Sequence, residues 1–141
     1  ARLSLERQAP QRFDLLAIDA FSSDAIPIHL LTLQAFEVYL RHLKPDGVLA
    51  IHISNRYLDL VPVCARAAQH FDRLAFLIEE PSNALSHAST WVLITSDPDL
   101  IAHVAFEDAE IEAVTALPSF RAWTDGYSNV WSVLKLRSNR S

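Results

Sequence analysis

Residues 13–27 read FDLLAIDAFSSDAIP, and this stretch decides the fold. Its apolar run from Leu15 to Ile18 is typical of a strand that is covered on both faces of a sheet. Asp19 ends the run, and a loop with two serines, a second acid and a proline follows. Ligands of open α/β sheets bind outside the carboxyl ends of the strands. A carboxylate at Asp19 is therefore placed to hold a cationic substrate or to take a proton from it.

Strand-type and helix-type segments alternate along the rest of the chain. The predicted strands cover residues 13–19, 48–53, 73–78 and 91–95. The predicted helices cover residues 29–43, 58–71 and 108–117, and Thr32 is the expected N-cap of the first one. A strand–helix–strand unit closes with parallel strands, so this alternation predicts an α/β fold with a mainly parallel sheet. An apolar stretch in the tail fits either a strand or a helix.

Composition narrows the function classes. The chain has 141 residues, half of them apolar, which indicates one packed domain. Its formal net charge is −5. Nucleic-acid binding needs a basic face, so this charge disfavours it. Cys64 is the single cysteine and lies in an apolar helical stretch, which favours a small buried hydrophobic residue over a nucleophile. The histidine spacing predicts no metal site, and no apolar run reaches the roughly 18 residues of a membrane span.

Glycine is scarce where a nucleotide-binding sheet needs it. Such a domain usually has a glycine-rich turn after its first strand. The two glycines here, Gly47 and Gly126, do not lie in such a turn. Either the chain binds no nucleotide-like cofactor, or the half of the domain that binds one is absent.

Several segments together resemble one family, the spermidine-synthase-like aminopropyltransferases. The resemblance is nearest to bacterial members of the fused type, some of which are joined to membrane transporter segments. Besides residues 13–27, the matching segments are LLT at 30–32, AF at 35–36, LKPDGVLA at 43–50, HISNRY at 52–57 and WTDGYS at 123–128. The resemblance implies a class I methyltransferase-like (Rossmann-like) sheet. It also implies decarboxylated S-adenosylmethionine as a co-substrate rather than a tightly bound cofactor, and a small-molecule polyamine as the acceptor.

Site residues follow from the same resemblance. The family's strand-end catalytic acid falls on Asp19 and its second loop acid, which binds substrate, on Asp24. The family's loop proline, which lies beside the adenine of the donor, falls on Pro27. Ser22 either hydrogen-bonds the donor or caps the loop. The chain departs from the family pattern where alanine rather than proline follows Asp24.

The tail adds two further site residues by resemblance. Asp125 and Tyr127 are expected to close over the bound substrate. Related tails often have two acids before the tyrosine, whereas here Gly126 takes the second place. Both this departure and the one after Asp24 bear on polyamine specificity.

The resemblance also predicts how the chain relates to a longer protein. The family's glycine-rich turn and ribose-binding acid precede the position of Ala1, so residues 1–141 are expected to be the C-terminal portion of one domain. The parent domain is expected in the cytoplasm, with membrane segments attached in some members. The first strand would then have an open apolar edge, which favours pairing with the missing half or a homodimer.

Aminopropyl transfer gives Asp19 a chemical task. The attacking amine must be neutral, yet an amine with a pKa of about 10 is mostly protonated at neutral pH. A positioned carboxylate can accept that proton, and Asp24 can pair with the distal ammonium of a diamine. Purely structural roles are the alternatives: Asp19 caps a turn, Asp24 is an ordinary loop acid, and His52 is a core histidine with its hydrogen bonds made. Two rival functions also stay open: a methyltransferase on the same fold, and a non-catalytic ligand-binding module attached to a transporter.

Overall fold

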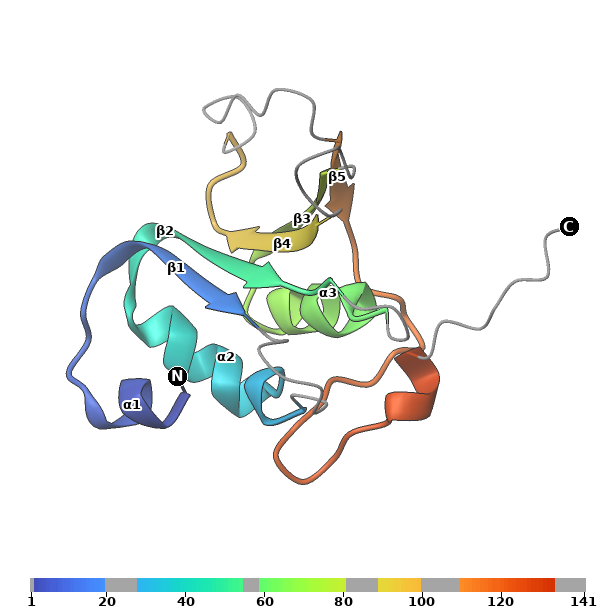
Figure 1. The fold of residues 1–141 in the computed structure, drawn as a ribbon, viewed down its shortest axis with the longest axis horizontal. Helices are drawn as coiled ribbons and strands as arrows, with labels where there is room; N and C mark the ends of the chain where they lie inside the picture. The colour runs from blue at the N-terminus through green and yellow to red at the C-terminus, as the bar shows by residue number, and fades with distance from the viewer. Residues whose placement is uncertain (1, 20–27, 55–58, 81–88, 100–109, 134–141) are drawn as a thin grey trace, which may run out of the picture.

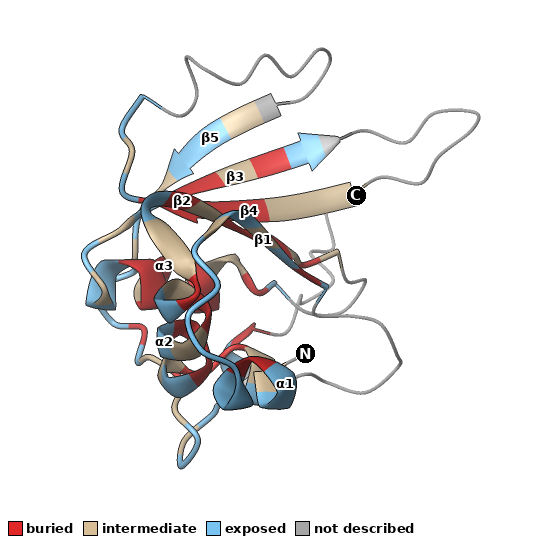
Figure 2. Ribbon diagram, turned by 90° about the vertical axis from the view of Figure 1, so that its left-hand side faces the viewer, coloured by how far each residue is buried: buried red, intermediate tan, exposed pale blue. Residues whose placement is uncertain are grey.

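The computed structural model describes residues 2–19, 28–54, 59–80, 89–99 and 110–133. A five-stranded sheet has the order β1-β2-β4-β3-β5. Its strands are β1 (Phe13–Asp19), β2 (Leu43–His52), β3 (Leu74–Glu80), β4 (Ser89–Thr95) and β5 (Glu110–Val114). The α-helices are α1 (Arg2–Arg7), α2 (Leu33–Arg41) and α3 (Val61–His70), and two short 3₁₀ turns are η1 (Ile28–Leu30) and η2 (Val130–Val133). All three α-helices lie on one side of the sheet (Figures 1 and 2).

Strand direction corrects one part of the predicted architecture. The α/β class is confirmed, but only β1 and β2 pair in parallel. β4 is antiparallel to both β2 and β3, and β5 is antiparallel to β3. β1, β2 and β3 therefore run in one direction, and β4 lies reversed between two of them. The connection from β3 to β4, residues 81–88, is shorter than the dozen or so residues that a parallel crossover needs, which explains the reversal.

Within the predicted helix at 108–117, residues 110–114 form the strand β5 instead. β5 adds to the outer side of β3, with Ile111 opposite Ile78 and Val114 opposite Ala75. Ile111 packs with the hydrophobic residues on one face of the sheet, and Val114 packs with those on the other. Apolar residues three apart resemble a helical pattern, but strand pairing satisfies the backbone groups of β3 and overrides it.

The predicted helix at 29–43 divides into η1 and α2. Thr32 is the N-cap of α2, as predicted, because its Oγ1 accepts a hydrogen bond from the Ala35 amide at 3.2 Å. In the apolar stretch of the tail, which by sequence fits either a strand or a helix, Val130–Val133 form the 3₁₀ turn η2.

β2 begins earlier than predicted and pairs irregularly at its start. Phe13 lies opposite Leu43, but Leu15 lies opposite Val48, so the residues between Leu43 and Val48 bulge out of register. A Cβ on Gly47 would lie 3.0 Å from the carbonyl oxygens of both Lys44 and Phe13. Glycine therefore permits this close backbone approach.

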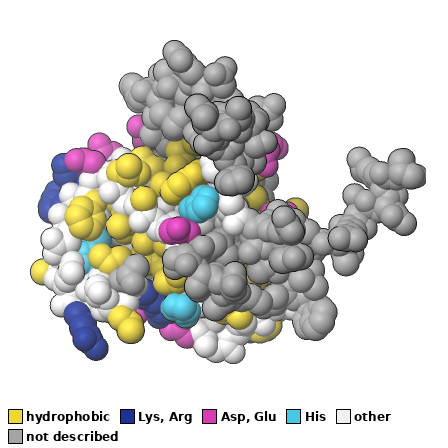
Figure 3. All heavy atoms as spheres, viewed as in Figure 1, with side chains coloured by type: hydrophobic (Ala, Val, Ile, Leu, Met, Phe, Trp, Pro, Cys, Tyr) yellow, Lys and Arg dark blue, Asp and Glu magenta, His cyan; other side chains and the backbone are white. Residues whose placement is uncertain are grey.

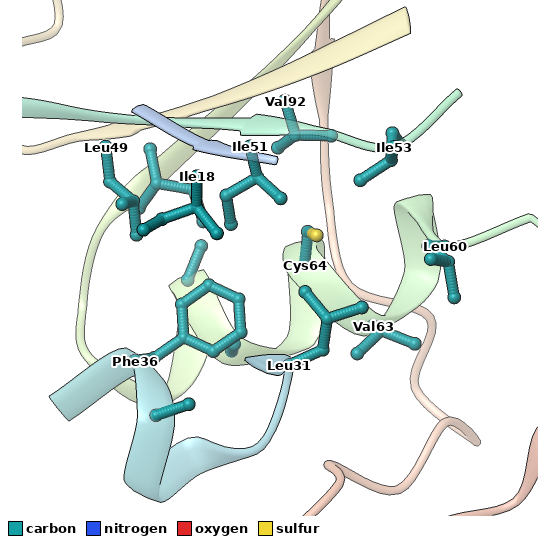
Figure 4. Packing of buried hydrophobic residues seen from close by; sticks show 14 of the residues in the cluster. Ile18, Leu31, Phe36, Leu49, Ile51, Ile53, Leu60, Val63, Cys64 and Val92 are labelled. Atoms are coloured by element: carbon teal, nitrogen blue, oxygen red, sulfur yellow. The ribbon is translucent and has the colours of Figure 1, made fainter. Parts of the chain in front are cut away.

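The main core lies between the sheet and the helices. Leu49 and Ile51 of β2 point toward α2 and α3, as does Ile53, which directly follows the strand (Figure 4). Cys64 of α3 is fully buried there, and burial raises the pKa of its thiol to about 12. The prediction of a small buried hydrophobic residue is confirmed, because such a thiol stays protonated and unreactive.

His42 fastens the N-terminal segment to this core. It is fully buried, and its Nε2 lies 2.7 Å from the Leu5 carbonyl oxygen at the end of α1. The Gln11 amide donates to its Nδ1 at 3.2 Å. These two partners define a neutral ring with its proton on Nε2.

The opposite face of the sheet has no helix among the described residues (Figure 2). A smaller cluster there comprises the buried Ala50, Phe76, Ile78 and Leu93. Leu15 on the edge strand β1 is 60% exposed. Within the described residues, no helix is long and apolar enough to cross a membrane.

Candidate functional site

Asp19 lies at the carboxyl end of β1, where the sequence places it. Its partner across the parallel pair is His52, the last residue of β2. The His52 Nδ1 lies 3.3 Å from the Asp19 Oδ1. The Asp19 side chain is 56% exposed and that of His52 is 25% exposed. The carboxylate is thus within reach of a ligand while the imidazole behind it is mostly enclosed.

Trp91 continues this row onto a third strand. It lies opposite His52 in the antiparallel pair of β2 and β4. The ring centroids of His52 and Trp91 are 4.8 Å apart and the planes are tilted by 38°. Neighbouring strands thus bring an acid, an imidazole and an indole into one line at this edge of the sheet.

The row faces away from the helices. Side chains alternate along a strand, and Ile18 and Ile51 belong to the core beneath the sheet. Asp19 and His52 follow them and therefore belong to the opposite face. In the space-filling view of Figure 3, acidic and histidine side chains adjoin a hydrophobic area on the molecular surface.

Asp125 is held by groups from two distant parts of the chain. Arg2 Nη1 and Nη2 donate to its Oδ1 and Oδ2 at 2.9 and 2.7 Å. The Thr32 hydroxyl donates to Oδ1 at 2.8 Å. The hydrogen bond from Arg2 is the main reason that the pKa of Asp125 is below its usual range, and the hydrogen bond from Thr32 adds to it. The negative charge of this carboxylate is therefore already balanced by Arg2 of the same chain.

Tyr127 lies two residues further, in a tight turn with Thr124. Two backbone hydrogen bonds join Thr124 and Tyr127, and the Arg121 guanidinium carbon lies 3.9 Å from the centre of the tyrosine ring. An open pocket of about 550 Å³ runs along this turn. Its lining consists of Ile28, His29, Thr32, Thr124, Asp125, Gly126, Tyr127 and Ser128. The structure thus brings Asp125 and Tyr127 to one pocket, whose lining does not include Asp19.

The remaining predicted site residues, Asp24, Ser22 and Pro27, lie outside the described residues. Their roles stay predictions. Sequence reasoning missed Arg2 as a partner of Asp125, since no local pattern links residues so far apart. The sequence does hint at His52 as a neighbour of Asp19, because Asp19 ends one predicted strand and His52 lies near the carboxyl end of the next.

A second cavity lies at the other end of the sheet. It has a volume of about 280 Å³ between the end of α3 and the start of β3, and residues 113–116 also line it. Leu74 in its wall pairs with Thr95, which in turn pairs with Val48, well before His52 along β2. The strand-end row lies at the opposite edge, so this cavity is separate from the candidate site.

The fold is of the class I methyltransferase-like α/β kind. It is similar to the crystal structure of a probable spermidine synthase from Corynebacterium glutamicum, with a TM-score of 0.61 and 18% sequence identity. The match covers 90% of this chain and 52% of that protein, so the chain spans about half the length of its structural relative. No family model and no curated protein matches the sequence.

Proposed function

We propose that the chain belongs to a transferase that moves an aminopropyl group from decarboxylated S-adenosylmethionine to a polyamine. The observation that carries this proposal is Asp19. It is a partly exposed carboxylate at the carboxyl end of a parallel strand, hydrogen-bonded to the end of the next strand, in a fold similar to that of a probable spermidine synthase. Sheets of this kind bind ligands at that edge.

The reaction suits a carboxylate. A protonated amine gives up one proton, and its free electron pair then attacks the carbon next to the sulfonium of the donor. The carbon–sulfur bond breaks with its electrons on sulfur, which leaves a neutral thioether and a new substituted ammonium. Asp19 is the group that meets the amine and accepts its proton, a role worth about 10²–10⁴-fold in rate.

Asp14 serves as an internal contrast. It lies near the start of the same strand, and its carboxylate is 83% exposed and paired with Lys44 at 2.9 Å. Its place at the amino end, away from the ligand edge, gives it no part in the proposed reaction.

The other site residues take supporting roles in this proposal. Asp24 pairs with the distal ammonium of the acceptor, while Ser22 and Pro27 contact the donor. Asp125 is occupied by Arg2 and Thr32, so we assign it and Tyr127 to the wall of the substrate pocket. The acceptor is a small polyamine, and the parent domain works in the cytoplasm.

The test is a transfer assay on the full-length protein. Putrescine is supplied with decarboxylated S-adenosylmethionine or, in parallel, with S-adenosylmethionine, and the products are identified by mass spectrometry. We expect an aminopropylated amine from the first donor only. A methylated product, or no turnover of either donor, would overturn the proposal.

A further inference from the structure

In the row Asp19–His52–Trp91, the imidazole of His52 lies between the strand-end acid and an indole ring. The backbone register places His52 opposite Asp19 on one side and opposite Trp91 on the other. The imidazole thus has a carboxylate oxygen 3.3 Å from Nδ1 and an indole ring 4.8 Å away, measured between ring centroids. Two contacts on different sides restrict how the ring can turn.

Hydrogen-bond chemistry identifies the form of this ring. An ionised carboxylate only accepts hydrogen bonds, so the Nδ1 atom facing it must carry the proton. Such second partners decide the tautomer of a histidine and hold both groups in place. His42 is the reverse case in the same chain, because a backbone amide donates to its Nδ1. The two histidines are therefore expected to be opposite tautomers.

We propose that His52 is the positioning residue of Asp19. Its Nδ1–H donates to Oδ1 and restrains the carboxylate at the strand end, while the Trp91 ring holds the imidazole. His52 acts through Asp19 and does not itself touch the reacting amine. The effect on catalysis rests on the proposed function, whereas the tautomer and the hydrogen bond do not.

The restraint matters because Asp19 is more than half exposed, so water competes for its carboxylate oxygens. Small misplacements of a reacting group are costly, and about 1 Å can lower a rate by about 10²-fold. Removing the donor from His52 should therefore lower kcat about 10- to 100-fold and leave KM nearly unchanged.

Two substitutions separate the hydrogen bond from the ring. His52→Asn places an amide N–H near the position of Nδ1 but has no ring to stack on Trp91. His52→Phe keeps an aromatic ring over Trp91 but has no donor. In the full-length protein we expect His52→Asn to retain most of the transfer rate and His52→Phe to lose it. Full activity in His52→Phe, or equal loss in both variants, would overturn the proposal.

A second measurement does not depend on activity. The ¹⁵N chemical shifts of the imidazoles in the full-length protein report which ring nitrogen carries the proton. We expect the Nδ1–H form for His52, lost in Asp19→Ala, and the Nε2–H form for His42 as an internal control. An Nε2–H form for His52 in the wild type would contradict the proposal, whatever the enzyme assay shows. If transfer is absent but the Nδ1–H form is found, the proposed function fails and the positioning contact stands.

Discussion

Arg2 and Asp125 form a bidentate ion pair although they are 123 residues apart in the sequence. Arg2 also donates to Glu6 at 2.8 Å and to the His29 carbonyl oxygen at 2.7 Å. The guanidinium thus joins α1, the η1–α2 segment and the tail turn at one point. The tail wall of the pocket described above is therefore held in place by the first helix.

This junction should contribute measurably to stability. Exposed ion pairs are worth about 0.2–1 kcal/mol, and a two-pronged arginine–carboxylate pair is among the stronger ones. We expect Arg2→Gln and Asp125→Asn each to lower the free energy of unfolding by about 1 kcal/mol in urea titrations. The double variant should lose less than the sum of the two. Glu6→Gln, which removes the negative charge of a partner that Arg2 contacts only once, is the matched control. Strict additivity of the two losses would contradict a direct pair.

Acid should weaken the same junction. The pKa of Asp125 is lowered in the folded chain, so its stabilising effect is fully present above the unfolded value of about 3.9. It is lost as the pH falls through the lower folded value. The stability difference between wild type and Asp125→Asn should therefore be largest near neutral pH and shrink below about pH 4. A difference that grows in acid would have the wrong sign.

Substitution of His42 should lower the stability of the protein more than substitution of an exposed histidine. His42→Phe keeps an aromatic ring in the core but leaves the Leu5 carbonyl and the Gln11 amide without their partner. Such losses cost about 1–3 kcal/mol. His70 is exposed at the end of α3, and His70→Gln should change stability by no more than about 0.5 kcal/mol. Equal thermal stability of His42→Phe and wild type would show that these contacts contribute nothing.

Cys64 offers a label for unfolding. It is the sole cysteine, it is fully buried, and burial raises the pKa of its thiol to about 12. Alkylation by iodoacetamide at neutral pH should be negligible in the folded protein and rapid in urea, because the thiolate is the reactive form. Labelling in native buffer at the rate of a short cysteine peptide would contradict the burial.

Local signals predicted those elements whose local pattern and tertiary packing agree. β1 and the Thr32 cap are examples, since periodicity and capping chemistry decide them. β5 was missed because Ile111 and Val114 have helical spacing, and only pairing with β3 makes them a strand. Strand direction likewise depended on where β4 inserts. Asp19 was found because strand ends are visible in the sequence, whereas the partner of Asp125 is set by the tertiary fold alone.

The central claim concerns the carboxylate at the end of β1, and its sharpest test compares two acids of that strand. The transfer rate at saturating donor and putrescine is measured for the full-length wild type, Asp19→Asn and Asp14→Asn. We predict that kcat falls about 10²- to 10⁴-fold in Asp19→Asn and stays at the wild-type value in Asp14→Asn. An Asp19→Asn variant that turns over as fast as the wild type, or no slower than Asp14→Asn, would contradict the account.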